Sequence, residues 1–404
     1  MNAVQPGSLR LPSRLWEVLF VATRLGVTSF GGPVAHLGYF REEYVNRRRW
    51  LDEETYADVV ALCQFLPGPA SSQVGIAVGI TRAGLLGGLA AWVGFTLPSA
   101  IALILFAYGV TTFGDVSGAG WLHGLKVVAV AVVALAVWGM ARNLCPDRPR
   151  ATIAIVSAVA IIALQSAVAQ IAVIAAGGVL GWLVLHQVQG GSTSTHRFPV
   201  GRGLAIGALV LFGLLLVGLP LLRQVVSSQP LAVFDSFYRV GSLVFGGGHV
   251  VLPLLQTEVV PPGWVTQDQF IAGYGAAQAV PGPLFTFAGY LGATIEGLPS
   301  RWMGGLLSLV AIFLPSFLLV AGALPFWDGL RSVTGFRRSL AGINAAVVGL
   351  LLAALYDPVW TSAIQSPNDF ALGLGAFGLL AFWRWPPWVV VLLAALGGEG
   401  LARL

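Results

Sequence analysis

Two short motifs that can bind ligands through their backbone occur twice in this chain, once in each half. Phe30-Gly31-Gly32 reappears as Phe245-Gly246-Gly247, and each copy is followed by Pro-Gly-Pro, at 67–69 and 281–283. The first proline comes 37 residues after the phenylalanine in one copy and 36 residues after it in the other. Proline lacks the N–H donor and glycine readily leaves helical geometry, so both motifs are expected to break helices. The open N–H groups at such breaks attract anions.

Polar side chains beside these motifs extend the predicted anion site. Arg24 and Arg239 each lie six residues before the motif phenylalanine, and Gln64 and Gln278 each lie three residues before the first proline. We therefore predict substrate contacts from Gln64, Ser71, Ser72, Gln278, Thr286, Gly31, Gly32, Gly246, Gly247, Arg24, Arg239 and Lys126. Two alternatives stay open: the motifs only kink helices for packing, and Lys126 only extends to the nearby membrane interface.

Residues that would support other chemistry are scarce. Asp58 is the single candidate proton carrier near the motifs, although an acidic residue early in a helix also stabilises its N-terminus. The apolar stretches contain no paired carboxylates, His-x-x-x-His pattern or activated serine, and the two cysteines are too few for a thiolate metal site. We expect no catalytic site, no metal and no cofactor, so the chain is not predicted to be an enzyme.

The elements that must position these residues are membrane helices. Of the 404 residues, 56% are apolar and only 10% are charged, whereas about 25% are charged in a typical soluble domain. Apolar stretches of about the length that spans a bilayer occur at 84–112, 121–141, 203–221, 299–325 and 336–356. The composition predicts an all-α polytopic membrane protein.

The chain divides into two repeats joined by a linker. We assign 1–188 to an N-terminal repeat, 189–230 to a linker with one connecting span, and 231–404 to a C-terminal repeat. The loop at 41–49 is rich in arginine, whereas its counterpart at 256–269 has no arginine or lysine. The positive-inside rule then predicts that the two repeats have inverted topology and carry broken or re-entrant helices. The net charge of +5 arises from these short loops rather than one basic face, which argues against nucleic-acid binding.

Jointly the motifs resemble the chromate ion transporter family in its long form with two homologous halves. The matching segments are 28–33, 64–69 and Leu97-Pro98-Ser99 in the first half, and 245–248, 278–283, Leu314-Pro315-Ser316 and 342–346 in the second. The resemblance implies a secondary transporter that exports chromate across a bacterial inner membrane and confers chromate resistance. Its partners would be chromate or a related oxyanion and the lipid bilayer, with a homodimer as a possible assembly. A proton-coupled transporter of sulfate or another oxyanion, and a passive anion channel, are the alternatives.

Overall fold

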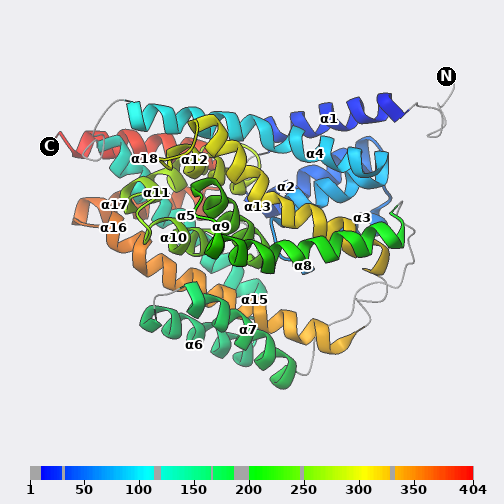
Figure 1. Cartoon of the computed structure of the whole chain (residues 1–404). Helices are drawn as coiled ribbons and strands as arrows, with labels where there is room; N and C mark the ends of the chain where they lie inside the picture. The colour runs from blue at the N-terminus through cyan, green and yellow to red at the C-terminus, as the bar shows by residue number, and fades with distance from the viewer. Residues whose placement is uncertain are drawn as a thin grey trace.

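The apolar stretches of the sequence form long helices. The computed structural model describes residues 11–29, 32–112, 120–164, 167–185, 200–245, 250–327 and 333–403, and its regular elements in these ranges are all helical (Figure 1). Five helices are long and apolar enough to cross a membrane: Ala70–Gly109, Gly120–Leu144, Arg202–Val225, Arg301–Phe326 and Thr334–Ala363. They coincide with the five predicted stretches, so the chain is an all-α polytopic membrane protein.

The two halves contain corresponding series of helices. The first half consists of α1 (Leu11–Thr28), α2 (Gly32–Arg41), the π-helical η1 (Glu42–Arg47), α3 (Glu53–Phe65), α4 (Ala70–Thr112), α5 (Gly120–Leu144), α6 (Arg148–Leu164) and α7 (Ala167–Val184). The second half begins with α9 (Gln229–Leu243), α10 (Val251–Val259), α11 (Gln267–Ala277), η4 (Leu284–Thr286), α12 (Phe287–Thr294) and α13 (Arg301–Ala323). It continues with η5 (Leu324–Phe326), α15 (Thr334–Ala354), η6 (Leu355–Trp360), α16 (Thr361–Ala363), α17 (Pro367–Ala381) and α18 (Pro387–Leu401).

The helices break where the motifs predict. Gly68 separates α3 from α4 at a φ of +125°, and Gly282 separates α11 from η4 at a φ of +96°. Gly32 begins α2 at a φ of +77°. Such positive φ angles are the conformations in which glycine has no steric cost. Gly31, Gly246 and Gly247, which were also predicted to contact the substrate, lie outside the described residues.

Corresponding helices exchange partners between the halves. Helix α5 of the first half packs against α17 and α18 of the second, and α15 of the second packs against α6 and α7 of the first (Figure 1). Glycines allow these close approaches: a Cβ on Gly124 of α5 would collide with the Ala394 backbone, and one on Gly342 of α15 with that of Gly177. The two halves are thus interlocked. Each contributes a helix that packs against the last two helices of the other, so they do not form two separate bundles.

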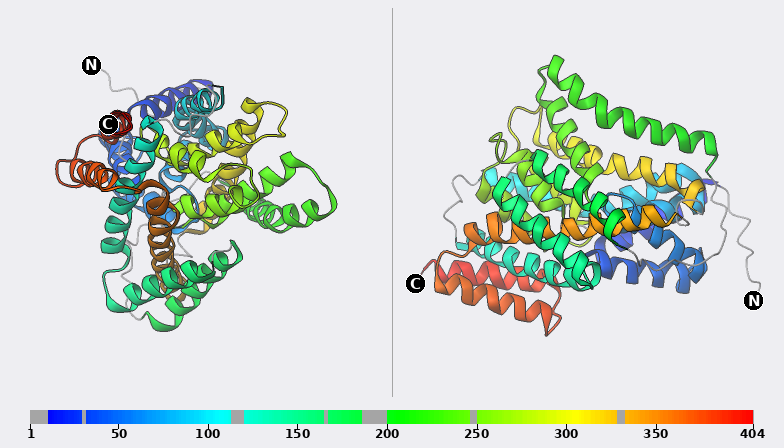
Figure 2. Two further views of the ribbon diagram at one scale, coloured as in Figure 1. Left: turned by 90° about the vertical axis from the view of Figure 1, so that its left-hand side faces the viewer. Right: turned by 90° about the horizontal axis from the view of Figure 1, so that it is seen from below.

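Helix α8 (Arg202–Val225) connects the two halves at the periphery. It runs along one edge of the molecule in the right-hand view of Figure 2, and most of its large apolar side chains are exposed. At 1.5 Å per residue its 24 residues span about 36 Å, enough for one crossing of a bilayer. In a membrane this exposed face contacts lipid.

Candidate functional site

Each Pro-Gly-Pro break is hydrogen-bonded to the residue directly before the glycine motif of the opposite half. The Gly68 N–H donates to the Val244 carbonyl at 2.6 Å, and the Gly282 N–H donates to the Ser29 carbonyl at 2.9 Å. Val244 and Ser29 are the residues directly before the two Phe-Gly-Gly motifs. Each break therefore lies beside the segment that leads into the glycine motif of the other half. Because these two N–H groups already have acceptors, the donors for a ligand must come from other groups.

The repeated Leu-Pro-Ser motifs lie beside the same breaks. A Cβ on Gly68 would collide with the Ser316 hydroxyl, and a Cβ on Gly282 would lie 2.9 Å from the Ser99 hydroxyl. Each serine again comes from the half opposite to the glycine that it approaches. Ser316 and Ser99 were not among the predicted contacts, although their repetition in the sequence was a signal that could have found them.

The first break is lined by buried polar side chains. In the first turn of α4, Ser71 Oγ lies 3.3 Å from His36 Nδ1, and the Ser72 hydroxyl is buried without a hydrogen-bond partner among the described residues. The next residue, Gln73, donates from Nε2 to the Pro67 carbonyl at 2.6 Å. The structure thus places the predicted Ser71 and Ser72 at the break, and adds Gln73.

The second break offers fewer open polar groups. Thr286 is fully buried, and its hydroxyl donates to the Pro283 carbonyl at 2.7 Å. The Gln278 Nε2 atom is buried and has no partner in the described part of the chain. Gln64, which occupies the equivalent sequence position in the first half, is exposed on α3. The two predicted glutamines therefore lie in different environments.

The two predicted arginines form equivalent ion pairs. Arg24 lies 3.6 Å from Glu43, and Arg239 lies 2.9 Å from Glu258; each acid comes thirteen residues after its motif phenylalanine. Arg239 also contacts Asp235 at 3.1 Å. The charge of each guanidinium is thus offset by carboxylates. This repeated Arg–Glu spacing was present in the sequence and was overlooked.

Lys126, the third predicted cation, also has an acidic partner. Its Nζ donates to Asp268 Oδ1 at 2.8 Å, and the lysine side chain is only 5% exposed. One turn earlier on α5, His123 Nε2 lies 2.7 Å from Asp369 Oδ1. Both pairs connect the start of α5 to helices of the second half, namely α11 and α17.

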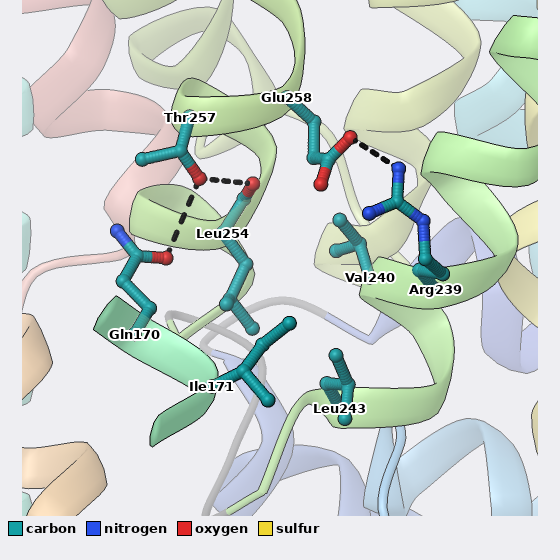
Figure 3. A pocket seen from close by; sticks show the side chains of 8 residues that line it. All are labelled: Gln170, Ile171, Arg239, Val240, Leu243, Leu254, Thr257 and Glu258. Carbon is teal, nitrogen blue, oxygen red and sulfur yellow. Dashed lines mark hydrogen bonds and ion pairs between the residues drawn. The ribbon is translucent and has the colours of Figure 1, made fainter. Parts of the chain in front are cut away.

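A small pocket lies beside the second ion pair. Its lining residues are Gln170, Ile171, Arg239, Val240, Leu243, Leu254, Thr257 and Glu258. Figure 3 shows the Arg239–Glu258 pair on one side and the Thr257 hydroxyl directed at Gln170 on the other, with the Thr257–Gln170 contact measuring 3.4 Å. Because Gln170 belongs to α7, the pocket forms where the first half meets α9 and α10.

Glu43 is the centre of a larger arginine cluster. Besides Arg24, it contacts Arg48 at 2.7 Å and Arg47 at 3.2 Å. Burial opposes ionisation of Glu43, but the hydrogen bonds from Arg48 and Arg47 outweigh it, so the pKa of this carboxyl lies below its ordinary value. The stability that these bonds contribute is therefore present above that ordinary value and is lost as the pH falls through the lowered pKa.

We expect Glu43→Gln to destabilise the protein more than Glu258→Gln. The first change removes the carboxylate that Arg24, Arg47 and Arg48 share, at a cost of about 1.5–3 kcal/mol. Of these three arginines, only Arg48 keeps another acidic partner among the described residues, Glu17 at 3.1 Å. The second leaves Arg239 with Asp235 as a partner. Thermal unfolding of the purified variants in detergent measures the difference. If both variants lost the same stability, the arginine cluster around Glu43 would stabilise the protein no more than a single ion pair does.

Comparison with known proteins identifies relatives along most of the chain. The family model described as chromate transporter matches residues 16–182 and 231–399. A chromate transport protein of Pseudomonas aeruginosa is 31% identical over 93% of this chain and 89% of its own length. A chromate transport protein of Cupriavidus metallidurans is 26% identical over 95% of this chain and 92% of its own. A probable chromate transport protein of Synechococcus elongatus is 25% identical over 93% of this chain and 92% of its own length. No solved structure matches the chain.

Proposed function

The chain belongs to the chromate transporter family, and we propose that it exports chromate across the bacterial inner membrane and thereby confers chromate resistance. The observation that carries this proposal is the reciprocal pairing of the helix breaks, Gly68 with Val244 and Gly282 with Ser29. At each break it brings together groups of both halves, with Ser316 beside Gly68 and Ser99 beside Gly282, as expected for a secondary transporter with repeated halves. The names of the relatives supply the identity of the anion.

The proposed binding site lies between the two breaks. The hydroxyls of Ser72 and Ser316 and the amide of Gln278 supply donors that have no other partner among the described residues. The first N–H groups of α4 add the positive end of a helix. Ser71, Thr286 and Gly32 are kept in the proposed lining. Gly31, Gly246 and Gly247 lie outside the described residues and stay predictions, and Gln64 is left out because its side chain is exposed. Carboxylates hold the side chains of Arg24, Arg239 and Lys126 and offset their charge, so these cations contribute little to the attraction of the anion.

We expect alternating access to come from movement of the helices around the two breaks, because the interlocked halves cannot move as two separate bundles. The backbone bonds of Gly68 and Gly282 cross between the halves, so rocking about this region changes which side of the membrane reaches the site. The loop charges predict opposite orientations for the two halves, and a single crossing by α8 would fit that inversion.

The membrane potential drives the anion outward. With a negative interior, each exported negative charge gains about 2.3 kcal/mol per 100 mV. A dianion therefore gains about 4.6 kcal/mol, which supports a concentration ratio of about 10³ at 1.4 kcal/mol per decade. Export on this basis needs no proton carrier, whereas uptake of the same anion does.

The test compares cells that express the chain with cells that carry an empty vector. We expect lower intracellular chromate and better growth in chromate, with and without excess sulfate. Unchanged intracellular chromate would refute export. Counterflow in proteoliposomes then separates a carrier from a channel, because only a carrier is accelerated by substrate on the opposite side. Loss of transport in Asp58→Asn would favour the proton-coupled alternative.

A further inference from the structure

Gln73 occupies a fixed orientation at the first helix break. Its side chain is fully buried, and its Nε2 donates to the Pro67 carbonyl at 2.6 Å. A backbone carbonyl can only accept a hydrogen bond, so the NH₂ group of the amide must face Pro67. The amide oxygen, Oε1, is therefore directed away from Pro67. If the oxygen and nitrogen exchanged places, Oε1 would face the Pro67 carbonyl oxygen, and two acceptors would repel each other.

The Gln73 Oε1 atom has no partner of its own. It is buried and accepts no hydrogen bond from any residue in the described ranges. A buried acceptor without a donor costs about 1–3 kcal/mol, so such atoms in native proteins call for an explanation. A ligand that brings a donor to this position removes the cost.

Other open groups near Gln73 can adapt to a ligand, but Gln73 Oε1 cannot. The hydroxyls of Ser72 and Ser316 also have no partner among the described residues, and a hydroxyl can either donate or accept. Both Ser316 Oγ and Gln73 Nε2 would meet a Cβ built on Gly68, so the serine and the glutamine amide approach the same point of the break. This break therefore combines hydroxyl donors with one group that only accepts.

The second half has no equivalent of this acceptor. The residue six positions after the first proline is Gln73 in the first half and Phe287 in the second. Phe287 is fully buried and stacks on Tyr290. The acceptor is consequently a single feature of the site and not part of the repeated framework.

We propose that Gln73 selects an oxyanion that carries a proton, hydrogen chromate, by accepting its O–H at Oε1. This inference rests on the proposed function and specifies the transported form of its substrate. Hydrogen chromate loses its proton near neutral pH, whereas hydrogen sulfate keeps its proton only in strong acid. A sulfate in the same place would direct an unprotonated oxygen at Gln73 Oε1.

On this proposal the same contact distinguishes chromate from sulfate, an oxyanion of the same shape. A site built to hydrogen-bond a substrate O–H rejects an analogue that lacks it by up to about 10⁴–10⁵-fold. The rejection comes from the unpaired acceptor and from repulsion between the facing oxygens. Hydrogen chromate also leaves the cell with one negative charge, which gives it half of the electrical driving force of the dianion.

The experiment measures chromate flux into proteoliposomes that contain the purified protein, with the pH varied on the side where substrate is added. We expect wild-type flux to rise as the pH falls, in proportion to hydrogen chromate, and sulfate in excess to inhibit weakly. Gln73→Met removes the acceptor. We expect its chromate flux to fall about tenfold, its pH dependence to flatten, and sulfate to inhibit at about tenfold lower concentration.

Gln256→Met is the matched control. It makes the same substitution at a partly buried glutamine of α10, whose Nε2 donates to Gln267 at 3.3 Å, away from the proposed site. It should keep the wild-type pH profile and the weak inhibition by sulfate. Stronger inhibition by sulfate is a gain that general damage to the fold does not produce.

Gln73→Glu provides a second variant if Gln73→Met does not fold. At acid pH the protonated carboxyl donates to the Pro67 carbonyl and keeps an acceptor oxygen, so flux should recover as the pH falls; at neutral pH the carboxylate should block it. Flux in this variant that ignores pH would overturn the proposal.

Two wild-type results would also overturn the proposal: flux that follows the dianion, and flux that is indifferent to pH. The proposal would also be overturned if sulfate inhibited the Gln73→Met variant only as weakly as it inhibits the wild-type protein. No wild-type chromate flux at any pH would instead contradict the proposed function.

Discussion

Gly68→Ala is expected to abolish chromate transport and to destabilise the protein. At a φ of +125° any side chain is strained, at a cost of about 1–3 kcal/mol, and the new Cβ would collide with the Ser316 hydroxyl. Relieving that collision shifts the backbone N–H that holds Val244 of the other half. Gly282→Ala should be milder, because its Cβ would lie 2.9 Å from Ser99 Oγ. Proteoliposome flux and thermal unfolding measure both effects.

Gly263→Ala separates backbone strain from collision. Gly263 also has a positive φ, of +75°, but a Cβ there would meet nothing within 4 Å. This variant should lose some stability and keep transport. If Gly68→Ala transported chromate at the wild-type rate, the break would not form part of the site.

Asp268→Asn should destabilise the protein by about 1.5–3 kcal/mol, because it removes the charged hydrogen-bond partner of Lys126, although the Asp268 side chain itself is 47% exposed. The lysine side chain is 5% exposed, and its Nζ is bonded to Asp268 Oδ1 at 2.8 Å. Replacing both residues, with Lys126→Met and Asp268→Asn, should recover most of the loss, since no buried charge then remains. Thermal unfolding of the two single variants and the double variant forms a double-mutant cycle that measures the coupling.

Glu53→Gln is the control for this cycle. It breaks the ion pair of Glu53 with Arg41, in which both side chains are more than half exposed, so little change is expected. An Asp268→Asn variant as stable as Glu53→Gln would show that Lys126 reaches solvent or lipid headgroups instead of depending on its partner.

The sequence predicts the local features of this fold well. Five apolar stretches correspond to the five long helices, and both Pro-Gly-Pro motifs end a helix, because hydropathy and backbone restriction act within a short segment. Which half contacts which is decided by packing over long distances. Nothing in the local sequence indicates that Gly68 bonds to Val244 rather than to its own half.

The candidate site was predicted only in part, for the same reason. Comparison of the repeats emphasised residues that both halves share, such as Gln64 and Gln278, although one is exposed and the other has a buried amide nitrogen. It overlooked Gln73, whose counterpart is Phe287, because a feature found in one half is invisible to that comparison. Burial and hydrogen-bond partners revealed it.

The exchange of helices between the halves has a consequence for biosynthesis. The chain is made from its N-terminus, so α5 is complete long before α17 and α18, against which it packs, have been synthesised. The partner of Lys126 follows it by 142 residues. The first half therefore enters the membrane with an uncovered helix face and an unneutralised lysine, and its native packing is completed only after α17 and α18 have been synthesised.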